Sequence, residues 1–274
     1  MVGSNYESDA LRNQKGKLEK IVAERTSEIQ SKNELLKDLN STKDKLFSVI
    51  SHDLRSPFNA ILGFESLLIH NYYDFTDIER IDMISQVHTT SNQLYILVEN
   101  LLNWAKLQNS TIQHYPVEFK LKEVILEKSE LYQYIAEVKG ITITHEIPDE
   151  ITAYADIHLM ETILRNLISN AIKFTTAGGS ILVIARQMNS TIEISVTDTG
   201  TGMTSEQIDT LFSLETTQPK FGTSGEKGSG LGLVLCKEFV EKNGGKINVE
   251  SQPGKGSTFR FTIPAAKAKM IQVI

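Results

Sequence analysis

Apolar residues at three- and four-residue steps mark one face of a helix near the start of the chain. The stretch FSVISHDLRSPFNAILGF runs from Phe47 to Phe64, and its apolar positions share a face because each residue turns a helix by about 100°. His52, Asp53 and Ser56 fall on the opposite, solvent side. Pro57 predicts a kink or the local loss of one backbone hydrogen bond. The apolar positions are Phe47, Ile50, Leu54, Pro57, Ile61 and Phe64.

Upstream of this helix, residues 9–45 contain no proline, and several of their apolar residues recur at seven-residue spacing. This spacing is typical of a coiled-coil seam, which Arg25, Glu28 and Lys32 interrupt. A single solvated helix is the alternative. We favour a parallel dimeric helix that continues into the His52 helix, because no helix breaker separates the two. The repeat comprises Leu11, Leu18, Leu39 and Leu46, with Ile21, Leu35 and Val49 at the complementary position.

A second long amphipathic pattern covers residues 78–108, after a polar connector at 71–77. Two long helices joined by a short loop predict an antiparallel hairpin. One hairpin buries little apolar surface, whereas two hairpins form a four-helix bundle, so a homodimer is expected. Helical periodicity is lost over residues 109–116, which predicts a domain boundary there.

Downstream of residue 116 the pattern changes to about five short alternating strands between helices. The element order is not the repeating order of a doubly wound fold, so we expect helices layered on one face of a mixed sheet. Asp156 is expected to cap the helix that follows it. The expected strands cover residues 117–121, 141–147, 180–188, 191–197, 246–251 and 257–263, and the expected helices cover 122–138, 156–174, 204–212 and 230–242.

Composition narrows the function classes. A net charge of −6 over 274 residues argues against a nucleic-acid binder that relies on bulk electrostatics. The single cysteine, Cys236, excludes a disulfide framework and is expected to be a small buried hydrophobe. No signal peptide or membrane-spanning run is visible. The opening Met-Val-Gly-Ser resembles an expression leader, so the natural protein is expected to extend further upstream.

The first candidate motif is the helical stretch Asn166-Leu-Ile-Ser-Asn-Ala-Ile-Lys-Phe. Asn166, Asn170 and Lys173 share one helical face, because they are spaced i, i+4, i+7. Two amides and an ammonium suit an anion with a hard cation, since Mg²⁺ takes oxygen ligands and often keeps phosphate oxygens. A solvated polar face explains the same spacing equally well.

Two glycine-rich motifs follow. Asp198-Thr-Gly-Thr-Gly ends a strand, where Gly200 and Gly202 let the backbone approach a flat ligand and the carboxylate can accept from an exocyclic amine. The alternative is a tight turn capped by Asp198. Gly228-Ser-Gly-Leu-Gly opens a helix, whose unpaired N–H groups and dipole favour phosphate. The alternative there is a flexible linker before a helix.

The three motifs in this order are far more specific than any one alone. With Ser51-His-Asp-Leu-Arg-Ser-Pro upstream, they resemble the transmitter region of a sensor histidine kinase over residues 45–264. The resemblance implies an α+β multidomain fold: a coiled-coil helix and a helical hairpin (a dimeric four-helix bundle), then an α/β-sandwich ATP-binding domain of the type shared with gyrase, Hsp90 and MutL. The implied segments are a coiled-coil signalling helix (1–44), a dimerisation and phosphotransfer domain (45–109), a hinge linker (110–116), a catalytic domain (117–264) and a tail (265–274).

The resemblance also implies a role for each motif residue. His52 accepts the γ-phosphoryl group of ATP, and Asp53 polarises the imidazole or takes its proton. Asn166 and Asn170 hold Mg²⁺ beside the triphosphate, with Lys173 as a nearby phosphate contact.

In the same way, Asp198 reads the adenine amine in a pocket that Gly200 and Gly202 shape. Phe212 lies beside an ATP lid formed by residues 213–229. The remaining implied nucleotide contacts are Gly228, Gly230, Leu231 and Gly232.

Ser56 is the clearest departure from the family pattern. Four residues after the histidine, the family usually has Thr or Asn, which positions water for dephosphorylating the partner. Serine has a smaller side chain, so the resemblance predicts a weak phosphatase.

These residues favour an ATP-dependent protein-histidine kinase that passes its phosphoryl group to an aspartate on a response-regulator receiver domain. A non-catalytic dimeric scaffold and a mechanical or repair ATPase are the alternatives. The intact motif set argues against the scaffold, and no further domain supports the ATPase. The sequence shows no sensor domain, so an upstream sensor, a membrane segment and a cytoplasmic location for this region are expected.

Overall fold

The computed structural model describes residues 3–108, 114–213, 222–224 and 230–266. The chain divides into two units, Met1–His52 and Asp53–Ile274, and the division lies within the first helix, α1 (Gly3–His70). Within the described ranges, no helix is long and apolar enough to cross a bilayer.

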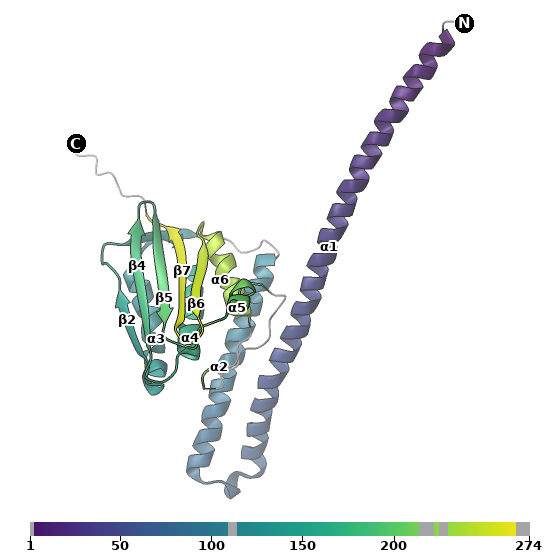
Figure 1. The fold of residues 1–274 in the computed structure, drawn as a ribbon. Coiled ribbons are helices and arrows are strands. Elements are labelled where there is room, and N and C mark those ends of the chain that lie inside the picture. Colours follow the sequence, from purple (N-terminus) through teal and green to yellow (C-terminus); the bar gives the residue numbers. More distant parts are fainter. Residues whose placement is uncertain (1–2, 109–113, 214–221, 225–229, 267–274) are drawn as a thin grey trace, which may run out of the picture. The chain divides into compact units, whose positions relative to one another are not determined.

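The predicted pair of long helices is present as α1 and α2 (Asp77–Gln108), joined by the short 3₁₀ helix η1 (Tyr72–Asp74) (Figure 1). Helix α1 continues through Pro57, so the proline removes one backbone donor without ending the helix. The hydrogen bonds of Thr76 and Glu79 close the start of α2: Thr76 N–H donates to the Glu79 carboxylate over 2.8 Å, and Glu79 N–H donates back to Thr76 Oγ1 over 3.3 Å.

Within the second unit, the stripe predicted on the first helix is half-buried at Leu54, Ile61 and Phe64. The pattern predicted on the second helix behaves differently, because Ile78 and Ile81 are 81% and 67% exposed. The start of this face therefore does not pack within one chain, whereas Val87 and Leu94 further along it are half-buried and Leu97 is buried.

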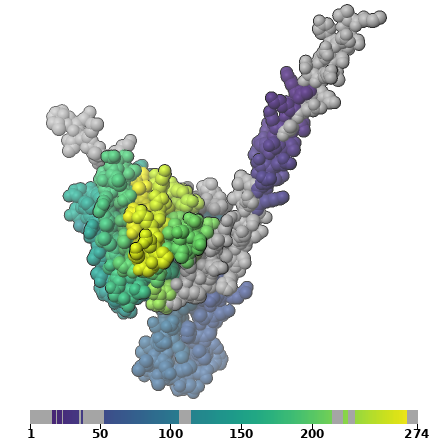
Figure 2. Space-filling view, viewed as in Figure 1, coloured from purple at the N-terminus to yellow at the C-terminus, as the bar shows by residue number. Residues whose placement is uncertain are grey.

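A five-stranded mixed sheet forms the centre of the downstream fold. Its strand order is β2-β4-β5-β7-β6, with β2 and β4 parallel and the other pairs antiparallel. Three helices cover one face of this sheet (Figure 1), and the other face is open (Figure 2). The sheet strands are β2 (Thr142–Glu146), β4 (Ser180–Met188), β5 (Thr191–Asp198), β6 (Ile247–Gln252) and β7 (Gly256–Pro264), and the covering helices are α3 (Leu121–Val138), α4 (Ile157–Phe174) and α6 (Leu231–Lys242).

The sequence prediction missed one strand. Strand β3 (Thr152–Asp156) pairs antiparallel with β1 (Pro116–Lys120) in a separate two-stranded sheet. Strand β1 also ends one residue earlier than predicted, because Leu121 begins helix α3 and is completely buried. Six strand ranges were predicted, and the described residues contain seven strands. The short helix predicted at 204–212 is present as α5 (Ser205–Asp209).

Local signals explain how α4 and the β4–β5 hairpin form. Asp156 caps α4 as predicted, and its carboxylate accepts from the backbone N–H groups of His158 and Leu159 over 3.0 and 3.2 Å. Asn189 has a positive φ of 55° in the tight turn between β4 and β5. Alternate residues of the two strands are buried against α4. The core at this contact includes Ile181, Val183, Ile192, Ile194, Ile163, Leu164, Leu167 and Ile168.

Candidate nucleotide site and phosphoacceptor helix

Helix α4 carries the first motif with its three polar residues in different surroundings. Asn166 is buried, whereas Asn170 and Lys173 are half-buried. The Asn166 Nδ2 group is enclosed and makes no well-formed hydrogen bond to any described residue. Its described neighbour is the Cys236 thiol, whose pKa is raised by burial and lowered to a smaller extent by this amide. A solvated polar face therefore does not describe Asn166. An enclosed donor without a well-formed hydrogen bond is costly, and an acceptor-rich ligand would satisfy it.

The start of α6 lies directly against Asn166. A Cβ added to Gly232 would be 2.9 Å from Asn166 Oδ1, so only glycine lets the helix and the amide approach this closely. Gly230 precedes the helix in the left-handed conformation, with φ of 71°, and offers no side-chain cap. The first N–H groups of α6 therefore remain available to an anion. Gly228 lies outside the described residues.

Asp198 ends β5 and is 5% exposed. Its Oδ1 accepts from the backbone N–H of Gly200 over 2.8 Å and of Ser257 over 3.3 Å. Burial raises the pKa of this carboxyl, and the two hydrogen bonds partly oppose that shift. The carboxylate is thus held in one orientation. Ser257 was not predicted, because its sequence surroundings carry no motif.

The glycines after Asp198 have a packing role besides the predicted one. A Cβ on Gly200 would lie 2.3 Å from the carbonyl oxygen of Phe174, and one on Gly202 would lie 1.9 Å from that of Gln252. Gly202 also has a φ of 64°. Because Thr201 N–H donates to the Phe174 carbonyl over 3.1 Å, this loop is fixed on the C-terminal end of α4. Asp198 does accept a hydrogen bond within a tight turn, as the alternative interpretation states. The same turn lies against the end of α4, beside the first motif.

All three motifs therefore meet around α4. The enclosed amide of Asn166 and the open helix terminus of α6 suit phosphate oxygens, and the fixed carboxylate of Asp198 suits an amine donor. The amide oxygens of Asn166 and Asn170 are of the ligand type that Mg²⁺ accepts. The donor set of the described residues fits ATP with Mg²⁺.

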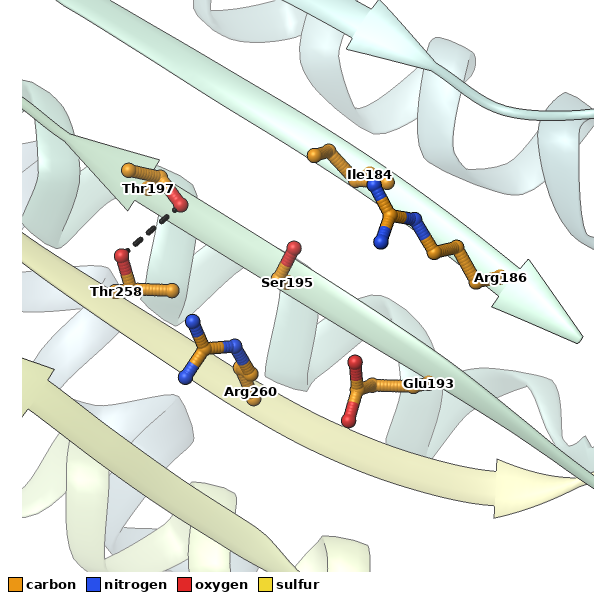
Figure 3. A pocket seen from close by; sticks show the side chains of 7 residues that line it. All are labelled: Ile184, Arg186, Glu193, Ser195, Thr197, Thr258 and Arg260. Carbon is orange, nitrogen blue, oxygen red and sulfur yellow. Dashed lines mark hydrogen bonds between the residues drawn. The ribbon is translucent and has the colours of Figure 1, made fainter. Parts of the chain in front are cut away.

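Two hollows lie near the motif residues, but neither is lined by residues of all three motifs. One, of about 530 Å³, borders Asp198, Ile208 and the β6–β7 turn but includes no residue of α4. The other, of about 170 Å³, lies on the open face of the sheet (Figure 3) and includes no predicted site residue. Its lining residues are Ile184, Arg186, Glu193, Ser195, Thr197, Thr258 and Arg260.

The predicted phosphoacceptor lies in helix α1. His52 is the last residue of the first unit, and its side chain lies outside the description. Ser56 is exposed, as predicted for the solvent side of the helix, whereas Asp53 is half-buried.

Two other predicted residues lie in the sheet domain. Phe212 is half-buried and packs against the core. Cys236 is completely buried as predicted, and burial raises its pKa to about 12.

Two protein-family models match the chain in the order that the motifs predict. The His Kinase A (phospho-acceptor) domain matches residues 42–110, and the histidine kinase-, DNA gyrase B-, and HSP90-like ATPase matches residues 155–267. Together they define a phosphoacceptor hairpin followed by a nucleotide-binding domain. The chain belongs to the sensor histidine kinases and represents their transmitter region.

Individual relatives agree with this assignment. The adaptive-response sensory kinase SasA of Crocosphaera subtropica is 32% identical over 228 residues, which cover 81% of this chain and 59% of the relative. Histidine kinase AdeS of Acinetobacter baumannii shares the fold, with a TM-score of 0.60 at 22% identity, covering 78% of this chain and 97% of AdeS.

Histidine kinase ThkA, solved in complex with the response regulator TrrA, has a TM-score of 0.58 at 25% identity. That match covers 79% of this chain and 60% of the matched chain. The chain thus spans roughly three fifths of the length of SasA.

Proposed function

We propose that this protein is an ATP-dependent protein-histidine kinase that phosphorylates its own His52 and then transfers the phosphoryl group to an aspartate of a response regulator. The observation that carries the proposal is the meeting of three motifs around α4, in a chain whose upstream helix matches a phosphoacceptor domain. A scaffold that binds nucleotide would need the same site, so the match of the upstream helix to a phosphoacceptor domain is what favours the kinase.

The proposed reaction requires little covalent help from the protein. The lone pair of one imidazole nitrogen of His52 attacks the γ-phosphorus, the bond from that phosphorus to the β–γ bridging oxygen breaks, and ADP leaves. Alignment and charge neutralisation supply most of the acceleration in such transfers. Neutral imidazole is available near pH 7 because its ordinary pKa is about 6.5.

Each site residue has a proposed task. Asp53 accepts from the second imidazole nitrogen and so fixes the tautomer that leaves the attacking nitrogen unprotonated. Asp198 accepts from the adenine amine, and the α6 terminus with Lys173 binds phosphate oxygens. Asn166 and Asn170 would hold Mg²⁺, which neutralises charge on the triphosphate.

Two partners are proposed: a second copy of this chain, which the hairpin supports, and a response regulator, which a relative supports. The exposed apolar residues Ile78 and Ile81 support a homodimer in which two hairpins form a four-helix bundle. The solved complex of ThkA with TrrA supports a response-regulator receiver domain as the acceptor. We also propose that the parent protein carries an upstream sensor and that this region works in the cytoplasm, as the predicted segments at 1–44, 45–109, 110–116 and 117–264 imply.

Incubation with γ-labelled ATP and Mg²⁺ tests the kinase proposal. The expected result is label on the protein that is labile in acid and stable in alkali, and that His52→Gln removes. Nucleotide binding without label would instead favour the scaffold, and release of free phosphate without label would favour the ATPase. Binding of ADP to His52→Gln should remain at the wild-type level, which shows that the variant is folded.

A further inference from the structure

The C-terminal end of α4 is held by residues that are distant in sequence. The last four carbonyls of any α-helix lack partners within the helix. Here the Ile172 carbonyl accepts from Lys139 Nζ over 2.8 Å, and the Phe174 carbonyl accepts from Thr201 N–H over 3.1 Å. The end of α4 is therefore bonded both to the end of α3 and to the loop after Asp198.

The most densely bonded group at this end is the carbonyl of Lys173. It accepts from Lys139 Nζ over 3.1 Å, from Thr223 N–H over 3.0 Å and from Thr223 Oγ1 over 3.2 Å. The Thr223 hydroxyl lies closer to the carbonyl of Thr175, at 2.9 Å, so its single proton is shared between the two carbonyls. Thr223 thus bridges the two residues at which α4 ends.

Thr223 lies in a short described segment between α5 and α6. Residues 222–224 are the described residues between Ser213 and Gly230, the stretch that joins α5 to the phosphate-facing terminus of α6. The residue that receives these bonds, Lys173, lies one turn beyond Asn170 on the face that carries the first motif. Thr223 is therefore placed to fix the end of α4 that carries Lys173.

We propose that Thr223 is a positioning residue for nucleotide binding, whose hydroxyl and backbone N–H hold the C-terminal end of α4, and with it Lys173, in place. The inference rests on the proposed nucleotide site. Its physical basis is preorganisation: a helix end that is already held before binding has less conformational freedom to lose when the nucleotide arrives. Removing the hydroxyl should weaken binding without altering the phosphoryl-transfer step.

The test compares Thr223→Val with Thr223→Ser. Valine keeps the shape and the backbone N–H bond to Lys173 but loses the hydroxyl donor that the Lys173 and Thr175 carbonyls share, whereas serine keeps it. Thr162→Val is a matched control, because the Thr162 hydroxyl bonds only to the His158 carbonyl of its own helix over 3.0 Å. Each variant is titrated with ADP and Mg²⁺ by calorimetry, and its autophosphorylation rate is measured against ATP concentration.

For Thr223→Val we expect the Kd for ADP and the KM for ATP to rise about fivefold, with kcat within about twofold of wild type, since one hydroxyl is lost outside the reacting atoms. Thr223→Ser and Thr162→Val should bind like wild type, and the melting temperature of the nucleotide-free protein should be similar in all variants.

An unchanged Kd in Thr223→Val, or an equal loss in Thr223→Ser, would overturn the role of the hydroxyl while leaving the kinase intact. A loss that also appears in Thr162→Val, with lower melting temperatures in both, would show a general stability effect and overturn it too. Failure of the wild-type protein to bind ADP would overturn the proposed function itself.

Discussion

Gly232→Ala is the sharpest test of how the nucleotide site is built. The added methyl would lie 2.9 Å from Oδ1 and 3.3 Å from Cγ of Asn166. The contact is with the end of a side chain, so the amide can rotate away while the backbone of α6 stays in place. The substitution should therefore displace Asn166 selectively.

The expected effects on stability and on binding differ in size. Alanine within a helix is favoured over glycine by about 1 kcal/mol, while a side chain pushed about 30° from its rotamer costs about 0.5–1.5 kcal/mol. These nearly cancel, so the melting temperature should change by only a few degrees. A lost hydrogen bond to a charged ligand costs about 1.5–3 kcal/mol, which corresponds to a roughly ten- to hundredfold weaker affinity for ADP with Mg²⁺.

Titration calorimetry with ADP and Mg²⁺, together with a thermal melt, measures both quantities. Gly63→Ala is the matched control, because a Cβ there meets nothing within 4 Å on helix α1. It should keep wild-type affinity. Wild-type affinity in Gly232→Ala would refute the placement of Asn166 at the nucleotide, and a melting temperature lowered by more than about 10 °C would refute the idea that only a side chain moves.

Two further predictions concern titration and dephosphorylation. Burial raises the pKa of Asp198, and its ionised form is the stronger acceptor for an amine, so ADP affinity should fall as the pH drops towards that raised pKa. Calorimetry between about pH 8 and pH 5 should show that ADP affinity falls more steeply with decreasing pH for wild type than for Asp198→Asn. An equal pH dependence of ADP affinity in the two proteins would contradict this. Ser56→Thr should raise dephosphorylation of a receiver domain phosphorylated by this kinase severalfold, because the larger side chain holds a water better; an unchanged rate would contradict it.

Helical periodicity and motif chemistry in the sequence were enough to locate the large elements. The helix from Ile157 to Phe174 follows from a capping aspartate before a strong apolar pattern, and Asp156 does cap it through two backbone N–H groups. Strands β4 and β5 follow from alternation around an Asn-Ser turn. These signals come from residues that are close together in the sequence, so a single sequence is enough to recognise them.

The missed features depend on contacts between distant residues. Strand β3 has five residues, two of them alanine, and it forms because β1 lies alongside it. The burial of Asn166 likewise depends on the approach of Gly232 from 66 positions downstream. Ser257 reaches Asp198 only because β7 pairs with β5, where the two residues are direct partners. No rule based on sequence spacing predicts contacts between residues that are so far apart in the chain.

The hairpin and the sheet domain differ in how they reach stability. The sheet domain buries Ile192, Ile194 and Phe261 completely within one chain, whereas Leu62 of the hairpin is 57% exposed and Ile78 is 81% exposed. Burying each large aliphatic side chain contributes about 1.5–3 kcal/mol, so several from each protomer offset an association cost of about 4–15 kcal/mol. In the proposed homodimer, a second hairpin would supply the core that one hairpin lacks. The stability of the hairpin should therefore rise with protein concentration, while that of the sheet domain should not.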